Sequence, residues 1–118
     1  MGCSLGRVEH EWADRVRRAA EALHNALYPG PDIAPRDDLD PRVFEKLNEA
    51  QNLLGKAENE LDTGLSGAEP NVDEGVRLAQ EAWDALEFVR ALMKPTPREV
   101  YTAWADSLRL LDPVVGHG

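Results

Sequence analysis

The chain has 118 residues with a formal net charge of −9, and 42% of its residues are hydrophobic. This size and composition suit one globular core, because two domains would each be too small to bury enough apolar surface, so we expect residues 1–118 to form a single domain. The negative charge disfavours binding of the whole surface to nucleic acid or to anionic membranes, since both present phosphate groups.

The first expected helix spans about residues 7–28. Its apolar residues recur at steps of three and four, as on one face of a helix: Val8, Trp12, Val16, Ala19, Leu23 and Leu27. Pro29 and Pro31 stop it, because proline lacks the backbone donor that a helix needs. We expect residues 29–39 to form a stiff proline-rich linker, and residues 1–6 to fray.

The second expected helix spans about residues 40–63 and has an explicit start. Asp40 can accept hydrogen bonds from the first amides, and Pro41 suits the first helical position. Steps of four and three then form a seam close to a coiled-coil repeat: Val43, Leu47, Ala50, Leu54, Ala57 and Leu61. Gly64 and Gly67 follow and end the pattern.

The third expected helix spans about residues 71–94. Asn71 and Glu74 have the spacing of a capping box, and Lys94-Pro95 marks the end. The residues expected on its buried face are Val72, Val76, Ala79, Trp83, Leu86 and Met93.

A shorter fourth helix is expected over about residues 97–111. Thr96 and Glu99 suggest a second capping box with Pro97 at the first helical position, and Asp112-Pro113 should close the helix. Residues 113–118 should fray. The apolar residues of this helix are Val100, Trp104, Leu108 and Leu111.

These segments predict an all-α, four-helix bundle-like domain, because each helix is apolar on one side only and needs partners to bury that side. The segments at about 40–63 and 71–94 should form a central antiparallel hairpin. Near-heptad stripes often continue across a symmetric interface, so a homodimer through that seam is a further expectation.

Arg17 and Arg18 precede His24 with six and five residues between them. This spacing resembles the Arg-x4-6-His motif of HEPN-type domains, which are all-α folds of similar size found in toxins and RNases. The resemblance implies that the arginine and histidine cooperate, usually across a dimer. They would position an RNA phosphodiester and supply a proton to it by general acid–base catalysis. Here the motif lies in the first helix, whereas the family usually places it late in the fold. An exposed basic cluster, or salt bridges to the acidic helices, is the alternative interpretation.

Glu21 and His24 have the Glu-x-x-His spacing that di-iron bundles use. Those bundles need two such motifs and two further glutamates, and His10 and His117 lie in no matching context. We therefore expect no metal site, with Glu21 and His24 as the only candidate ligands. The simpler interpretation is that His24 is exposed and pairs with Glu21 without a metal.

A polar stripe on the second helix is a candidate contact surface: Asn48, Asn52, Gly55 and Asn59. Gly55 costs about 1 kcal/mol relative to alanine inside a helix, which a close helix approach would explain. Trp12, Trp83 and Trp104 fall on the apolar stripes and are expected in the core. Trp12 could instead anchor a partner, because tryptophan is enriched in interface hot spots.

The sequence carries no phosphate-binding glycine loop, no Cys-x-x-Cys and no nucleophile elbow, and we expect no cofactor. It also lacks an apolar segment of about 20 residues, and its lone Cys3 agrees with a reducing compartment, which favours a cytoplasmic protein. The arginine-rich, alanine-rich composition suggests a bacterial source.

The leading hypothesis is a non-catalytic protein–protein interaction module, either an adaptor, an inhibitor or immunity-type factor, or a regulatory subunit. The alternatives are a HEPN-like RNase or toxin-antitoxin component using Arg18 and His24, and a helical bundle that senses a small molecule.

Overall fold

The computed structural model describes the backbone of residues 3–28, 39–62 and 71–116, with side chains from residue 11 onward. Within these residues it contains no strand and five helical elements, as the all-α prediction requires. The elements are α1 (Cys3–Leu27), α2 (Pro41–Leu61), α3 (Val72–Phe88), the short 3-10 helix η1 (Arg90–Leu92) and α4 (Arg98–Val115). None of the described helices combines the length and apolarity that crossing a membrane requires.

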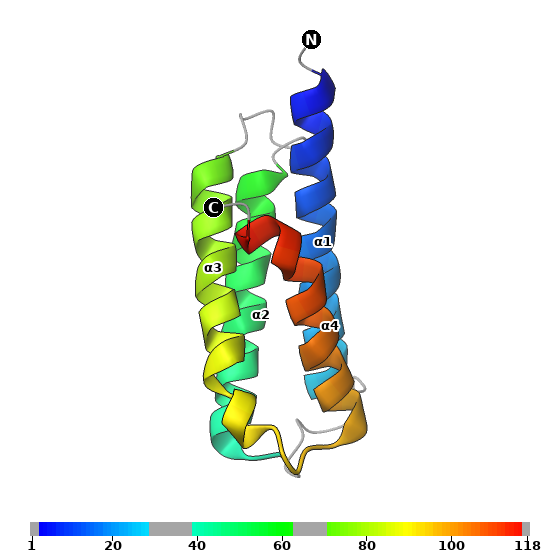
Figure 1. Ribbon diagram of the computed structural model, residues 1–118, viewed down its shortest axis with the longest axis vertical. Helices are drawn as coiled ribbons and strands as arrows, with labels where there is room; N and C mark the ends of the chain where they lie inside the picture. Colours follow the sequence, from blue (N-terminus) through cyan, green and yellow to red (C-terminus); the bar gives the residue numbers. More distant parts are fainter. Residues whose placement is uncertain (1–2, 29–38, 63–70, 117–118) are drawn as a thin grey trace.

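The four α-helices form an up-down-up-down bundle, in which each helix packs against two neighbours (Figure 1). The order around the bundle is α1, α2, α3, α4, and α4 closes the ring by packing against α1. The predicted bundle and its antiparallel α2–α3 hairpin are therefore confirmed. The fourth helix completes the bundle rather than lying across its end.

The predicted seam of α2 forms the centre of the core. All six of its residues are buried, with exposures of 0–2%: Val43, Leu47, Ala50, Leu54, Ala57 and Leu61. Because their side chains are enclosed within one copy of the protein, the seam is not available as the interface of the expected homodimer.

Asp40 and Asn71 are the N-cap residues of α2 and α3, as predicted, but the capping box at α3 is only half formed, because the Asn71 amide donates to Glu60 O at 2.8 Å. The Asp40 side chain accepts a hydrogen bond from the Arg42 backbone amide at 2.8 Å. The Asn71 side chain accepts one from the Glu74 amide at 3.2 Å. Helix α1 instead starts earlier than expected, at Cys3, so residues 3–6 are helical rather than frayed. Gly6 disfavours a helix by only about 1 kcal/mol relative to alanine, and it does not interrupt this one.

Helix α3 differs from its prediction in both length and buried face. It ends at Phe88, six residues before Lys94, and the chain continues through Val89 into η1. Its buried face is centred on the side toward α2, so three residues expected in the core, Val72, Val76 and Trp83, are only half-buried. The residues that take the central places are Gly75, Leu78, Ala82 and Ala85.

Helix α4 differs at both ends. Pro97 is its N-cap residue, no side chain caps the helix, and the buried Thr96 hydroxyl has no hydrogen-bond partner, so the predicted capping box is wrong. The helix also continues past Pro113 to Val115. A proline this close to the C-terminus removes a single backbone hydrogen bond, and the complete burial of Val114 holds the last turn in place.

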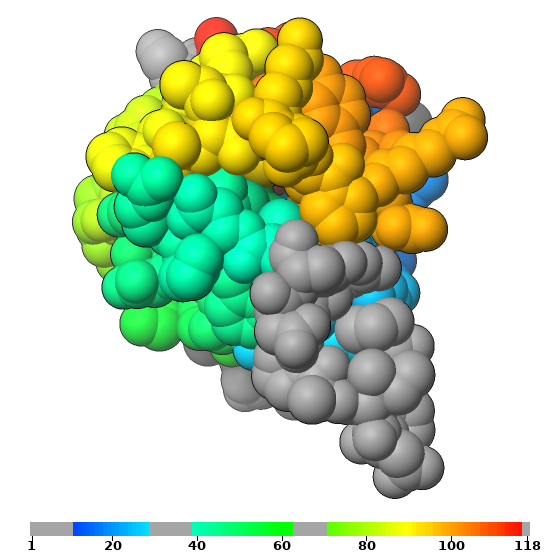
Figure 2. Space-filling model, turned by 90° about the horizontal axis from the view of Figure 1, so that it is seen from below, coloured from blue at the N-terminus to red at the C-terminus, as the bar shows by residue number. Residues whose placement is uncertain are grey.

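The end of the bundle where α3 passes into α4 is covered by the η1 segment and the first residues of α2 and α4 (Figure 2). Here Trp104 is the one tryptophan of the three that is buried, while Trp12 and Trp83 pack against the core from its edge. Of the three tryptophans expected in the core, only Trp104 is therefore buried there.

Candidate functional site

The arginine and histidine of the HEPN-like motif lie on different sides of α1. Arg18 and His24 are six residues apart, which corresponds to an angle of about 120° around a helix. Arg18 lines a hollow shared with Asp106 and Arg109 of α4, whereas His24 contacts Gln51 of α2. Within one copy of the protein, the two groups are therefore not directed at a common phosphate.

His24 belongs to a hydrogen-bonded chain between α1 and α2. Asn48 Oδ1 accepts from Tyr28 Oη at 3.2 Å and from Gln51 Nε2 at 2.8 Å. Gln51 thereby turns its Oε1 toward His24 Nδ1, at 3.2 Å. Because an amide oxygen can only accept, this contact requires His24 Nδ1 to be the donor.

Arg17 lies near the same side of α1 as His24, but acidic neighbours engage it. It pairs with Asp14 and, at 3.0 Å, with Glu21. On α2, partial burial raises the pKa of the Glu58 carboxyl above its ordinary value, while Arg17 opposes that rise. The α1–α2 surface is therefore a strip of carboxylates around one arginine.

Glu21 and His24 do not recruit further metal ligands. Among the residues whose side chains the structure describes, no three histidine, cysteine, aspartate or glutamate residues form a group that could hold a metal ion. Glu21 instead accepts a hydrogen bond from Arg17, and His24 contacts Gln51.

The predicted polar stripe of α2 divides into different environments. Asn48 is half-buried in the chain to His24, and together with Asn52 it lines a shallow hollow of about 310 Å³. Asn52 and Asn59 are exposed. A Cβ atom at Gly55 would meet no atom within 4 Å, so the close helix approach expected there is wrong. The close approach occurs at Gly75 of α3, where a Cβ would lie 2.5 Å from Leu61 Cγ.

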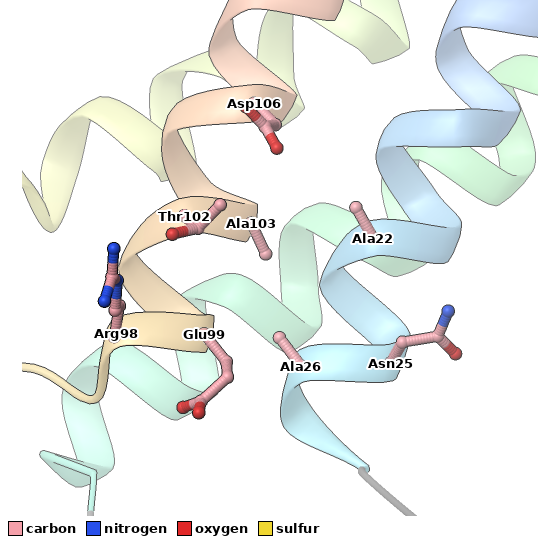
Figure 3. Close-up of a pocket in the computed structure, with 8 residues that line it drawn as sticks. All are labelled: Ala22, Asn25, Ala26, Arg98, Glu99, Thr102, Ala103 and Asp106. Atoms are coloured by element: carbon pink, nitrogen blue, oxygen red, sulfur yellow. The ribbon is translucent and has the colours of Figure 1, made fainter.

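A groove between α1 and α4 is a surface feature that the sequence did not predict. Its first half is a hollow of about 470 Å³ (Figure 3). Ala22 and Ala26 of α1 face Ala103 of α4 across it, and these small side chains form its floor. The polar residues at its edges are Asn25, Arg98, Glu99, Thr102 and Asp106.

The second half of the groove is a hollow of about 580 Å³ that shares Ala22 and Asp106 with the first. Three arginines line it, Arg15 and Arg18 from α1 and Arg109 from α4. The remaining lining residues are Leu110, Asp112 and Pro113. Together the two hollows follow α4 from residue 98 to residue 113, a length of about 22 Å at 1.5 Å per residue.

The arginines of this groove are less tightly paired than the arginines elsewhere. Arg15 reaches Leu110 O at 3.3 Å and Glu11 at 3.8 Å, Arg18 reaches Asp14 at 3.6 Å, and Arg109 reaches Asp106 at 3.3 Å.

Each described arginine outside the groove has a carboxylate oxygen within 3.0 Å: Arg17, Arg42, Arg77 and Arg90. Charged hydrogen bonds are normally about 2.7–2.9 Å long, so the groove holds guanidinium groups with unused donor capacity.

Comparison of the chain with protein-family models, with curated proteins and with solved structures finds no match. The groove and the α1–α2 strip must therefore be interpreted from their own chemistry.

Proposed function

We propose that this protein is a non-catalytic protein-binding module of a bacterial cytoplasmic system, and that the α1–α4 groove receives a helix of its partner. The observation that carries this proposal is the pair of adjoining hollows, the first of which is lined by the small side chains of Ala22, Ala26 and Ala103. Small side chains at the bottom of a trough leave room for the larger apolar side chains of an approaching helix. Helix-in-groove docking is a recurrent way in which proteins bind one another.

The shape of the groove supports a protein partner better than a small molecule. A small-molecule site encloses most of its ligand, whereas both hollows are open to solvent along about 22 Å of α4. That length corresponds to four turns of a docked helix. An adaptor, an inhibitor or immunity-type factor, and a regulatory subunit would each use such a surface.

The same geometry supports binding better than RNA cleavage. The acid–base pair that the HEPN resemblance implies requires an arginine and a histidine at one phosphate. Arg18 faces α4, while His24 is engaged with Gln51 of α2. The single cysteine of the sequence supports the cytoplasmic location.

Filling the groove tests the proposal. Ala22 is half-buried and borders both hollows, so Ala22→Trp places an indole in the trough without entering the core. Ala91→Trp adds the same side chain at an exposed position of η1 and serves as the matched control. Both variants should keep the helical circular dichroism spectrum of the unaltered protein.

The binding measurement compares three immobilised proteins in extract of the source organism, followed by calorimetry with each purified candidate partner. We expect a partner that binds the unaltered protein and Ala91→Trp equally and binds Ala22→Trp at least about tenfold more weakly. A partner whose affinity is the same for all three proteins would place binding outside the groove and refute the proposal. Absence of any saturable partner would refute it as well.

A further inference from the structure

The charge of the groove differs from the charge of the chain as a whole, and this difference indicates the chemistry of the occupant. The chain as a whole has a net charge of −9, and α3 alone contains five acidic residues and one arginine. The groove instead gathers Arg15, Arg18, Arg98 and Arg109. Because Glu99, Asp106 and Asp112 also line it, the groove holds four arginines and three carboxylates, a net charge of +1, whereas α3 carries −4.

The contacts of these arginines show that intramolecular pairing does not saturate them. Arg18 and Arg109 each reach a carboxylate only at 3.3–3.6 Å, and their side chains are 59% and 79% exposed. Arg17 precedes Arg18 in the chain and forms the closer ion pair with Asp14, so the ion pair of Arg18 with Asp14 is longer. A guanidinium group has five donors in a fixed planar fork, which matches the two oxygens of a carboxylate.

Resting on the proposed function of the groove, we infer that its occupant is an amphipathic helix that presents carboxylates to Arg18 and Arg109. The apolar ridge of this helix lies over Ala22, Ala26 and Ala103, and its acidic side chains extend toward the end of the groove lined by arginines. An acidic partner at this end gains charge-assisted hydrogen bonds that the protein itself does not supply.

Carboxylates within the groove favour a peptide over a nucleic acid. Glu99, Asp106 and Asp112 line the same trough, and they would repel a continuous row of phosphates. A peptide helix can place an uncharged or basic residue opposite each of them. The acidic residues of α3 lie on a helix that does not line the groove. Their electrostatic effect is screened beyond about 8 Å at physiological ionic strength.

The test uses three designed amphipathic peptides of 18 residues with the same leucine and alanine ridge and with glutamate, glutamine or lysine at the flanking positions. Each peptide is titrated into the 15N-labelled full-length protein, and amide chemical-shift changes locate the contact. We expect the glutamate peptide to shift amides of residues 15–26 and 98–113 and to bind about tenfold more tightly than the glutamine peptide, the effect of one close charge pair.

Charge exchange separates recognition from a change in folding. Arg18→Glu combined with Arg109→Glu should lower the affinity for the glutamate peptide about tenfold and raise the affinity for the lysine peptide. Lys56→Glu, on the exposed side of α2, makes the same type of charge change away from the groove and should alter neither affinity more than about twofold. Arg18→Gln with Arg109→Gln, which adds no new negative charge, should lose the preference without reversing it.

The outcomes distinguish this inference from the proposed function beneath it. Equal binding of all three peptides in the groove would refute the acidic occupant and leave helix docking intact. Peptide-induced shifts confined to other surfaces would refute both. A single-stranded 12-nucleotide DNA provides the last comparison. If it caused larger amide chemical-shift changes in the groove than the glutamate peptide does, the arginines would bind phosphate groups, and the inference would be overturned.

Discussion

The indole Nε1 of Trp104 donates a hydrogen bond to the carbonyl oxygen of Leu86 at 2.8 Å, and this bond joins the interior of α4 to the last turn of α3. The Leu86 carbonyl needs an external donor, because α3 ends at Phe88 and the last four carbonyls of a helix have no partner in the next turn. Trp104 is only 4% exposed, so the bond lies in the core. The guanidinium group of Arg90 covers the same indole, with its Cζ 5.2 Å from the ring centroid.

Trp104→Phe should therefore lower the free energy of unfolding by more than its loss of volume explains. The change removes the only donor in the ring and leaves the Leu86 carbonyl unpaired, which costs about 1–3 kcal/mol. Urea denaturation followed by circular dichroism measures the change. Trp83→Phe is the matched control, because Trp83 is half-buried. A loss in Trp104→Phe no larger than in the control would show that the hydrogen bond contributes nothing.

Gly55 of α2 and Gly75 of α3 should respond to alanine in opposite directions. Gly55→Ala adds a methyl group to open space and removes the helix penalty of glycine, so it should stabilise the protein by about 0.5–1 kcal/mol. Gly75→Ala places a methyl 2.5 Å from Cγ of the buried Leu61 and should destabilise it by about 1–3 kcal/mol. Midpoints of chemical denaturation for the two variants test the sign. Stabilisation by both changes would mean that α2 and α3 can separate at no cost.

Local chemistry explains why α2 was predictable from the sequence. Asp40 and Pro41 act within one turn, and the six seam residues keep their spacing throughout the helix, so no distant contact was needed to find them. The end of α3 was different, because it depends on how the chain turns to deliver α4. Val89 and Met93 are buried in that turn, and their burial replaces the regular helix that Lys94-Pro95 had suggested.

The groove escaped prediction because its features are tertiary. Ala22 and Ala26 share a side of α1, but the sequence does not reveal that this side faces α4 at Ala103. Arg17 and Arg18 are both within reach of Asp14 on a helix, and only the structure shows which one pairs closely. The sequence could identify the chemical groups but not their state of pairing.

Thr96→Val should leave the protein as stable or make it more stable, by up to about 1 kcal/mol. The Thr96 hydroxyl is buried without a hydrogen-bond partner among the described residues, and the valine side chain has nearly the same shape without that polar atom. Thermal and urea unfolding measure the difference. Thr102→Val makes the same change at an exposed site, where water solvates the hydroxyl, and serves as the control. A clear loss of stability in Thr96→Val alone would show that the hydroxyl does find a partner in solution.

Glu58 and Glu74 should give opposite dependences of stability on pH, because their pKa values shift in opposite directions. Partial burial raises the pKa of Glu58, so its ionised form disfavours the folded state above that pKa, and the penalty disappears as the pH falls below the unfolded value of about 4.3. The hydrogen bonds from Arg77 lower the pKa of Glu74, so its contribution is complete above the unfolded pKa and is lost as the pH falls through the folded one.

Glutamine substitutions test these two signs by comparing each variant with the unaltered protein from pH 7 to pH 3. Glu58→Gln should be the more stable protein at pH 7, with its advantage vanishing toward pH 3, where Glu58 is protonated. Glu74→Gln should be the less stable protein at pH 7, and its deficit should shrink as the pH falls. Urea midpoints at each pH provide the measurement. If Glu58→Gln were no more stable than the unaltered protein at pH 7, burial would not control Glu58, and the strip of carboxylates between α1 and α2 would be as well solvated as the outer face of α3. If Glu74→Gln were no less stable at pH 7, the hydrogen bonds from Arg77 would contribute nothing to stability.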